Sequence, residues 1–535
     1  MDTTRRSFLA MAAGAGIAAL ALSDDRKPLR THYPAIVVGS GYGGGVSALR
    51  LGQADVHTLV LEKGRLWDSP DDDDKRFSKM LPPDNRAGWF ASIAPSLVPS
   101  YMGVSVAEVA KRTPSNQPVQ AGICDKSIHG AHTIFRGIAV GGGSMINAAV
   151  AAVPTPAQVR EAFPDLDILE FFGEYMPRAR EMLRISYRNM PWFEQTPWYQ
   201  YARVGRQYAA TAGYPVDYNG SAYSFDYMRK EEADQVPRSA LAFEQQFGNN
   251  HGRVGSVDQT YLAAAQATGN VTIRPLTEVL AVSREPDGEW VVYTRTIDRW
   301  GNALGYNEIG CEQLHLAAGV LGTVKILLRA RDVGVLPDLS DEIGRGYGNN
   351  GDVMVSHMLK DSDPAGTQQS LMGLINLDGR SDPANPVYAT IFSIPLPAET
   401  HALAYYAMVK TDDRADITYD KESDTATVNW PQAHTEHLFD KAHAVFDNLT
   451  AANGVDYRDD LFEGNAFAAN TVHPMGGCVR GKATDNYGRV KGYDNLYVND
   501  ASLLPGYLGC NPFMTITALA EHNIEAILQR KHESA

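Results

Sequence analysis

A histidine and an asparagine near the C-terminus have the residue types and settings best suited to catalysis in this sequence. His473 is followed by a proline and, one residue later, by two glycines, in the run HPMGG. Such a run predicts a rigid turn that fixes the imidazole, which can then act as a base or as a hydrogen-bond donor. Asn511 precedes a proline and a predicted helix, so its amide can face a planar ring. The alternative for His473 is a histidine whose hydrogen bonds are satisfied within a core.

Closely spaced glycines near the N-terminus indicate a nucleotide-binding turn. An apolar run ending at Val38 is followed by GSGYGGG and then by a helical pattern, which predicts strand, tight turn and helix. In this pattern Gly39 permits the turn, Gly41 lets the backbone approach a pyrophosphate, and Gly44 lets the helix pack on the strand. The residues of this turn assigned to cofactor binding are Gly39, Gly41, Tyr42, Gly43 and Gly44.

Two further features support a nucleotide site on the same sheet. A second predicted strand ends on Glu62, at the distance where a carboxylate accepts hydrogen bonds from a ribose. A later strand, 313–318, runs into a turn at Gly319 and continues as a helix, and a second nucleotide-facing turn is what a doubly wound fold requires. The alternative is a glycine-rich turn in an unrelated α/β protein.

Three consecutive glycines, Gly141 to Gly143, predict that the backbone approaches a ligand closely. They are followed by serine and, three residues later, by asparagine, so that backbone N–H groups can crowd against a planar group without side-chain obstruction. A close contact between helices would use the same glycines. The residues assigned to cofactor binding here are Gly142, Gly143, Ser144, Met145 and Asn147.

These elements predict an α/β protein with a doubly wound, nucleotide-binding Rossmann-like domain and an α+β substrate domain that contains an antiparallel sheet. Alternating apolar patterns at 387–392 and 402–407 predict the antiparallel strands. We assign 31–73, 255–345 and 485–535 to this discontinuous nucleotide-binding domain, which the family resemblance given below identifies as FAD-binding, and 74–254 and 346–484 to the substrate-binding domain.

Composition and the N-terminus limit the function further. The 535-residue chain has a net charge of −15, which argues against nucleic acid as a partner because neutralising phosphate needs a basic patch. Paired arginines, Arg5 and Arg6, precede a short apolar run, which predicts a twin-arginine signal over residues 1–23, recognised by the twin-arginine export machinery and cleaved near Ala21. A fraying N-terminal helix is the alternative. The four cysteines lack metal-ligand spacing, so we expect buried thiols and no metal site.

Taken together, the motifs resemble the glucose–methanol–choline (GMC) family of flavin oxidoreductases, and within it the bacterial cholesterol-oxidase branch with non-covalent FAD. The resemblance runs from about Tyr33 to about Gln529 and is carried by GSGYGGGVSALRLG, GGGSMINAA, GNNHG, TYLAAA, AAGVLGTVKILLRARD, VHPMGGC, NYGRVKGYDNLYVNDASLLPG and NPFMTITALAEHN.

The resemblance implies roles for individual residues. Glu62 matches the ribose ligand, Val279 the backbone contact to adenine, and Asp500 a ligand of the ribityl chain and phosphate. His473 matches the active-site histidine and Asn511 the asparagine beside the isoalloxazine. Its motifs also include other residues assigned to the cofactor site, namely Gly319, Ala501, Pro512 and Phe513.

The implied reaction is hydride transfer from a secondary alcohol to flavin N5 while His473 holds or deprotonates the hydroxyl, followed by reoxidation with O₂ to give H₂O₂. The expected substrate is an apolar alcohol or sterol, such as a 3-hydroxysteroid, and peripheral contact with a membrane would serve its extraction. A twin-arginine signal implies a periplasmic or secreted enzyme. Two alternatives stay open: a dehydrogenase of another bulky alcohol with an acceptor other than O₂, and a lipid-binding flavoprotein that has lost catalysis.

One position departs from the pattern of this branch. Its members carry a glutamate on an active-site strand that moves a proton when the steroid double bond isomerises. Ungapped matching through Pro395, Glu399 and Thr400 places Thr390 there. A threonine hydroxyl does not ionise near neutral pH, so we expect isomerisation to be weak or absent.

Overall fold

The computed structural model describes residues 30–71, 74–80, 83–90, 118–366, 370, 374–394, 401–458 and 470–534, with side chains described up to residue 529. The predicted export signal, most of the 93–120 stretch and the matched positions Pro395, Glu399 and Thr400 lie outside these residues. Among the helices that are described, none is long and apolar enough to cross a bilayer.

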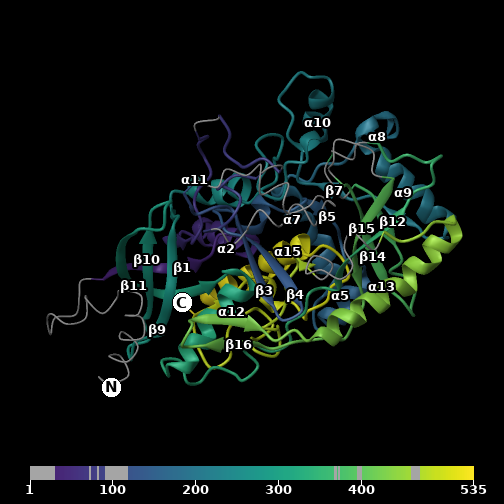
Figure 1. Ribbon diagram of the computed structural model, residues 1–535. Coiled ribbons are helices and arrows are strands. Elements are labelled where there is room, and N and C mark those ends of the chain that lie inside the picture. Colours follow the sequence, from purple (N-terminus) through teal and green to yellow (C-terminus); the bar gives the residue numbers. More distant parts are fainter. Residues whose placement is uncertain are drawn as a thin grey trace.

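A seven-stranded sheet forms one side of the molecule (Figure 1). Five strands run parallel in the order β8-β2-β1-β11-β19, and β9 and β10 extend the first half of β11 as an antiparallel meander. The central strand β1 carries a continuous apolar run because both faces of a parallel sheet are covered. The strands are β1 (Thr31–Val38), β2 (Thr58–Leu61), β8 (Val271–Arg274), β9 (Thr277–Arg284), β10 (Trp290–Ile297), β11 (Ala303–Leu316) and β19 (Leu496–Val498).

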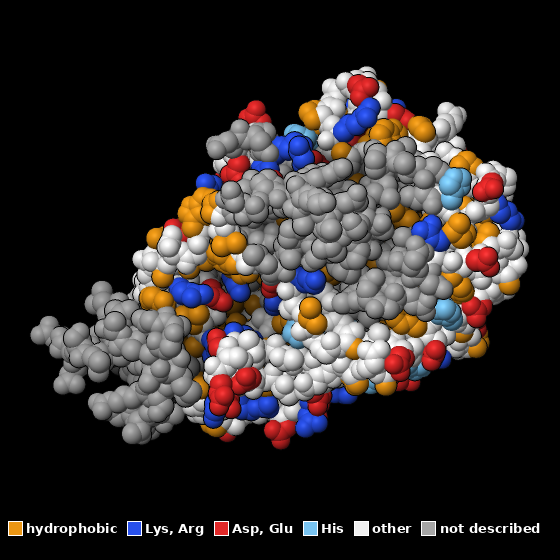
Figure 2. All heavy atoms as spheres, viewed as in Figure 1, with side chains coloured by type: hydrophobic (Ala, Val, Ile, Leu, Met, Phe, Trp, Pro, Cys, Tyr) orange, Lys and Arg blue, Asp and Glu red, His pale blue; other side chains and the backbone are white. Residues whose placement is uncertain are grey.

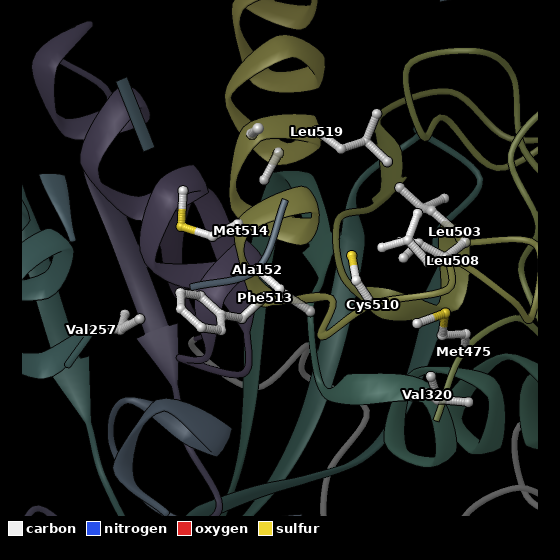
Figure 3. Packing of buried hydrophobic residues seen from close by; sticks show 14 of the residues in the cluster. Ala152, Val257, Val320, Met475, Leu503, Leu508, Cys510, Phe513, Met514 and Leu519 are labelled. Carbon is white, nitrogen blue, oxygen red and sulfur yellow. The ribbon is translucent and has the colours of Figure 1, made fainter. Parts of the chain in front are cut away.

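Three helices place the nucleotide-facing turns. Helix α2 (Tyr42–Gln53) starts at the glycine turn after β1 and packs against α15 (Phe513–Ser534), the last helix of the chain. Helix α12 (Gly319–Asp332) starts directly after β11. Figure 3 shows Phe513 and Met514 in the first turn of α15 beside α2, with Cys510 on the loop that leads into α15. The doubly wound arrangement is therefore confirmed.

A second, antiparallel sheet lies on the other side of the molecule, where α13 (Gln432–Asn453) and α9 (Gln200–Thr211) pack on it (Figure 1). Its order is β12-β15-β14-β13-β6, and it confirms the antiparallel sheet predicted from residues 387–392 and 402–407. The strands are β6 (Val216–Asp217), β12 (Asp352–Met358), β13 (Asn376–Asp378), β14 (Val387–Phe392) and β15 (Ala402–Val409).

Alternation along these strands separates two buried faces. Ile391 of β14 and Leu403 of β15 point toward Gly205 of α9, where an added Cβ would lie 2.9 Å from both side chains. Phe392 of β14 and Tyr406 of β15 point to the other face of the sheet and line a cavity. The smaller sheet is thus covered by helices on one face and forms a cavity wall with the other.

Smaller elements connect the two sheets. The remaining strands are β3 (Cys124–His129), β4 (His132–Gly137), β5 (Val150–Ala151), β7 (Gly220–Ser221), β16 (Ile417–Asp420), β17 (Thr425–Val428) and β18 (Asn470–Thr471). The remaining helices and helical turns are η2 (Gly142–Met145), α5 (Pro156–Ala162), α6 (Ile168–Glu170), η3 (Phe171–Tyr175), α7 (Met176–Met182), α8 (Met190–Gln195), η4 (Pro197–Tyr199), α10 (Phe225–Glu232), η5 (Ala240–Ala242), η6 (Asp258–Leu262), α11 (Ala263–Ala267) and η7 (Ala501–Leu503).

All four cysteines are buried free thiols, as predicted. Burial raises the pKa of each thiol, to about 12 for Cys510 next to the candidate catalytic asparagine. At neutral pH these groups are therefore protonated and unreactive.

A buried histidine under the smaller sheet makes the stability of the fold depend on pH. His357 of β12 stacks on Tyr208 of α9, with ring centroids 5.3 Å apart, and accepts a hydrogen bond from Tyr405 at 3.1 Å. Burial lowers its pKa from 6.5 to about 4, because a charged ring would lose its hydration. Between these pH values the unfolded chain binds a proton that the folded chain does not, so stability falls as the pH is lowered.

We expect His357 to remove about 3 kcal/mol from the free energy of unfolding as the pH falls from 6.5 to 4. Urea unfolding of wild type and His357→Gln at several pH values measures this, because glutamine does not titrate. The difference in stability between the two proteins should shrink as the pH falls. A difference that is independent of pH would contradict the prediction.

Candidate active site

A single cavity of about 710 Å³ joins the carboxyl ends of the parallel strands to the inner face of the smaller sheet. Its size lies within the range of about 300–1,000 Å³ that is usual for ligand sites. The nucleotide-facing turns after β1 and β11 line one end, together with Glu62 and Val279. Side chains from the smaller sheet and from the His473 and Asn511 loops line the other end.

The first glycine turn has the close backbone contacts that its sequence predicts. A Cβ added to Gly43 would lie 1.6 Å from the carbonyl oxygen of Asn499, and one on Gly44 would lie 2.1 Å from that of Gly39. Gly39 itself has φ +95° and packs on the Ala317 backbone. Gly41 instead borders open space, with only the Gly142 Cα within 4 Å of an added Cβ. The turn therefore packs on β19 and β11 and leaves its Gly41 side free.

The second glycine loop lies against the first. An added Cβ on Gly142, at φ +56°, would lie 2.8 Å from the Gly41 Cα, whereas one on Gly143 would meet nothing within 4 Å. Both glycines line the cavity. Ser144 and Met145 were also predicted to face the cofactor, but neither lines the cavity. They support the loop from behind, because Ser144 Oγ donates to Gly141 O at 2.7 Å and Met145 packs into an apolar cluster.

Asn147 ends this loop in a polar network beside the first turn. Its Nδ2 donates to the Tyr42 hydroxyl at 2.6 Å, and its Oδ1 accepts from Arg253 and from the Ala149 backbone. Burial raises the pKa of Tyr42 to about 12, so its hydroxyl keeps its proton. Tyr42 also stacks on Phe513, with ring centroids 5.1 Å apart. Asn147, Tyr42 and Phe513 all line the cavity.

Glu62 lies where a ribose ligand is expected. Its Oε2 accepts from Ser40 N at 3.0 Å and Ser40 Oγ at 2.7 Å, and its Oε1 accepts from Gly64 N at 2.7 Å. Burial raises the pKa of the carboxyl. A carboxylate offers about four acceptor positions, so one position on Oε1 is left for a hydroxyl in the cavity. The ribose contact stays a prediction.

The Asp500 carboxylate already accepts more hydrogen bonds from the protein than its predicted role as a cofactor ligand suggests. Its Oδ2 accepts from Gly319 N at 2.9 Å and Thr323 Oγ1 at 2.6 Å, and its Oδ1 accepts from the backbone and hydroxyl of Ser502. Burial raises the pKa of this carboxyl also. With four hydrogen bonds in place, the side chain joins the start of α12 to η7. Cofactor hydroxyls at this turn would therefore have to bind backbone groups, or Asp500 would have to give up one of its present hydrogen bonds.

The remaining predicted cofactor residues come together at the same cavity. Val279 of β9, Gly319 at the start of α12, Ala501 of η7, and Pro512 before α15 all line it. An added Cβ on Gly319, at φ +73°, would meet nothing within 4 Å. The starts of α2, α12 and α15 therefore converge on one space, and helix starts favour anionic groups.

His473 and Asn511 meet at the substrate end of the cavity. Asn511 Nδ2 lies 3.3 Å from His473 Nε2, and both side chains line the cavity. The Asn511 Oδ1 atom is buried and has no hydrogen-bond partner within the described part of the chain. An acceptor left open in this position is suited to a hydroxyl donor on a bound ligand.

Asp352 is a functional candidate that sequence reasoning missed. Its Oδ1 lies 3.0 Å from His473 Nδ1, and the side chain is fully buried at the start of β12. It follows a glycine in an otherwise unremarkable loop, so no motif marks it. Only the alternation along β12, which puts Asp352 on the same face as the cavity-lining Met354, could have pointed to it.

Thr390 lines the cavity wall on β14. Its hydroxyl donates to Oδ1 of Asn376, its cross-strand partner on β13, at 2.8 Å. Among the described cavity-lining residues that come from the smaller sheet and from the 470–474 segment, the ionisable side chains are Tyr406 and His473.

The residues present fit FAD. Two glycines with open space at their Cβ positions, Gly41 and Gly143, let a phosphate or a planar ring approach the backbone, and Gly319 leaves similar space although its own N–H donates to Asp500. Glu62 keeps an acceptor position for a ribose, and Asn511 Oδ1 lacks a partner at the other end. Among the described residues, no group of three or more His, Cys, Asp or Glu side chains is suited to a metal ion.

Comparisons with known proteins agree with this assignment. Two family models match, "GMC oxidoreductase, C-terminal" over residues 350–463 and "GMC oxidoreductase" over residues 409–520. The cholesterol oxidase of Mycobacterium tuberculosis is 24% identical over 92% of this chain and 90% of its own length. The cholesterol oxidase of Acinetobacter baumannii is also 24% identical, over 92% of this chain and 94% of its own length.

Solved structures share the fold. Pyridoxine 4-oxidase from Mesorbium loti superposes with a TM-score of 0.60 at 18% identity, covering 92% of this chain and 99% of its own. A fungal aryl-alcohol oxidase superposes with a TM-score of 0.62 at 13% identity, covering 94% and 100%. With its glycine-lined nucleotide cavity and its paired histidine and asparagine, the chain belongs to the GMC oxidoreductase family and is a FAD-dependent flavoprotein related to cholesterol oxidase.

Proposed function

We propose that this flavoprotein oxidises a bulky, apolar secondary alcohol, of which a 3-hydroxysteroid such as cholesterol is the best candidate, to the ketone, with O₂ as electron acceptor. The observation that carries the proposal is the His473 and Asn511 pair, which faces an apolar wall directly beside the nucleotide cradle. Similarity to cholesterol oxidases over nine-tenths of the chain supports the steroid class.

The side chains at the substrate end can hold and deprotonate a hydroxyl. The alcohol donates its O–H to His473 Nε2, which takes the proton as the carbinol carbon loses hydride. Asn511 lies 3.3 Å from the same nitrogen, so its amide borders the point where the hydroxyl would bind. When bound, FAD supplies the hydride acceptor and passes the electrons on.

The cavity wall favours an apolar substrate. Met354, Phe392 and Val472 line it, and Met80, Phe135 and Ile146 line the region around the Gly142 loop. Burial of apolar surface contributes about 25 cal/mol per Å², which suits a large hydrocarbon ligand. Because Thr390 cannot move a proton as a carboxylate does, the proposed product keeps its original double-bond position.

For the N-terminal segment we propose export by the twin-arginine route to the periplasm or beyond. The support is Arg5 and Arg6 before a short apolar run. A route that carries folded proteins suits an enzyme whose cofactor site is assembled from distant parts of the chain.

Figure 2 shows acidic and basic side chains interspersed on the visible face, so the net charge of −15 is not gathered there into one patch.

Anaerobic mixing with cholesterol tests the proposed function. We expect the visible absorbance band of the oxidised flavin to bleach, and to return on admission of air with formation of H₂O₂. Cholesteryl methyl ether, which lacks the hydroxyl, is the matched control and should leave the band unchanged. Steroid analysis should find the unconjugated ketone.

Each other outcome removes a defined part of the proposal. Bleaching by other bulky alcohols and not by cholesterol would overturn the steroid assignment. Bleaching without recovery in air would point to an acceptor other than O₂. The appearance of conjugated enone as fast as the oxidation would contradict the assignment of Thr390.

A further inference from the structure

We propose that Asp352 is a positioning residue that fixes His473 in the tautomer needed for proton uptake and balances the charge that this uptake creates. The inference rests on the proposed function, because it deepens the role of His473. Nothing in the sequence motifs distinguishes Asp352, and the case for it comes from the contacts around its carboxylate.

Three donors surround the Asp352 carboxylate. His473 Nδ1 lies 3.0 Å from Oδ1, while the hydroxyls of Tyr406 and Thr471 donate to Oδ2 at 2.9 Å and 2.7 Å. The Thr471 hydroxyl in turn accepts from the His473 backbone N–H at 2.9 Å. The carboxylate therefore holds the histidine through its ring, and Thr471 holds it through its main chain.

The partners on the two ring nitrogens define the tautomer. A carboxylate can only accept, so Nδ1 must carry a hydrogen, and Asn511 Nδ2 can only donate, so Nε2 must be the acceptor. Together they select the neutral ring with Nδ1–H and a lone pair on Nε2. That lone pair points to the side where Asn511 and the cavity lie, which is where a substrate hydroxyl would bind.

The charge at this position is uncompensated until His473 takes a proton. Asp352 is fully buried, and among the described residues its one ion-pair partner is His473. The titratable groups that face it are His473, Tyr406 and Tyr347, and of these only His473 becomes a cation. A buried carboxylate without a fixed cation stabilises an imidazolium that forms beside it. Transfer of the alcohol proton to Nε2 therefore turns a lone buried anion into an ion pair.

The Asn511 amide can adapt to the protonation of His473. Once Nε2 carries the alcohol proton it becomes a donor, and the Asn511 Nδ2 group can no longer donate to it. Rotation of the amide would present Oδ1, which has no partner among the described residues, to Nε2–H. Asp352 and Asn511 thus serve His473 both before and after it takes the proton.

The test is Asp352→Asn, which keeps the shape and removes the charge. We expect the rate of anaerobic flavin reduction to fall about 10²–10⁴-fold, since loss of a carboxylate that orients a catalytic histidine has cost a similar factor in serine proteases. Asp352→Glu should recover part of this loss. The matched control is Asp378→Asn on β13 of the same sheet, whose carboxylate pairs with Arg380 and does not line the cavity.

Histidine NMR gives a readout that does not depend on turnover. In FAD-loaded wild type, ¹⁵N signals assigned through the His473→Gln difference should report a proton on Nδ1 of His473. Wild-type signals that show the neutral Nε2–H tautomer would overturn the proposal even if Asp352→Asn fails to fold.

The two proposals fail in different ways. Wild-type rates in Asp352→Asn, together with loss of activity in His473→Ala, would remove the role of Asp352 and leave the proposed function standing. Flavin reduction that neither substitution affects would remove the role of His473 itself.

Discussion

His473→Ala is expected to lower the rate of anaerobic flavin reduction by about 10²–10⁴-fold while FAD remains bound. The imidazole lies at the substrate end of the cavity, 3.3 Å from Asn511, and is the proton acceptor that an alcohol would reach there. Its removal leaves the hydroxyl proton without a base, so the charge that develops on oxygen is not neutralised. Stopped-flow absorbance of the flavin band measures the rate, and the absorbance ratio of flavin to protein measures the bound cofactor.

A control histidine separates this effect from general damage. His437→Ala removes a part-exposed imidazole on α13 that pairs with Asp413 and does not line the cavity. We expect it to leave flavin reduction within twofold of wild type, in keeping with the small effects usual for surface substitutions. An unchanged rate in His473→Ala, with cofactor fully bound, would refute the assignment of His473 as the base.

The substitution with the largest expected effect on assembly is Gly43→Ala. Its added methyl group would lie 1.6 Å from the carbonyl oxygen of Asn499, a backbone atom that cannot move without displacing β19 and the Asp500 turn. Overpacking of this kind costs about 1–3 kcal/mol or more, and here the cost falls on the nucleotide cradle. We expect little FAD-loaded, soluble protein, as measured by flavin absorbance and by thermal unfolding.

Two other glycines give matched controls for the same chemical change. At Gly143, which lines the cavity, an added Cβ meets no protein atom within 4 Å, so Gly143→Ala should fold and lose mainly FAD affinity. Gly173 in η3 is exposed and equally unhindered, so Gly173→Ala should match or slightly exceed wild-type stability. Normal yield and normal FAD content in Gly43→Ala would show that the turn can shift more easily than the contact suggests.

Local patterns were sufficient to predict much of the fold. The glycine turn after β1 and the strands β14 and β15 follow from rules that relate neighbouring residues. Asn511 and His473 could be singled out because proline and glycine make their turns recognisable. The roles of Ser144 and Met145 were missed because a loop sequence does not tell which side chains face a cavity and which hold the loop from behind.

Asp352 could not be predicted because its role depends on a contact between distant segments. Its partner His473 lies 121 positions away, and Tyr406 reaches the same carboxylate from β15. Asn376 likewise becomes the partner of Thr390 only through the register of β13 and β14. Such pairs are set by sheet register and packing, which a single sequence does not reveal.

The strand and helix that complete the nucleotide cradle, β19 and α15, lie far along the chain from the first glycine turn. Gly43 emerges from the ribosome long before Asn499, which it touches, and long before α15, which packs on α2. Such long-range contacts cannot form during most of synthesis, and chain segments that await partners are exposed to aggregation and proteolysis. A chain that stopped short of β19 would contain the complete glycine motif and still lack the nucleotide site to which that motif contributes. Capture of FAD at this cradle therefore has to wait until β19 and α15 have been translated.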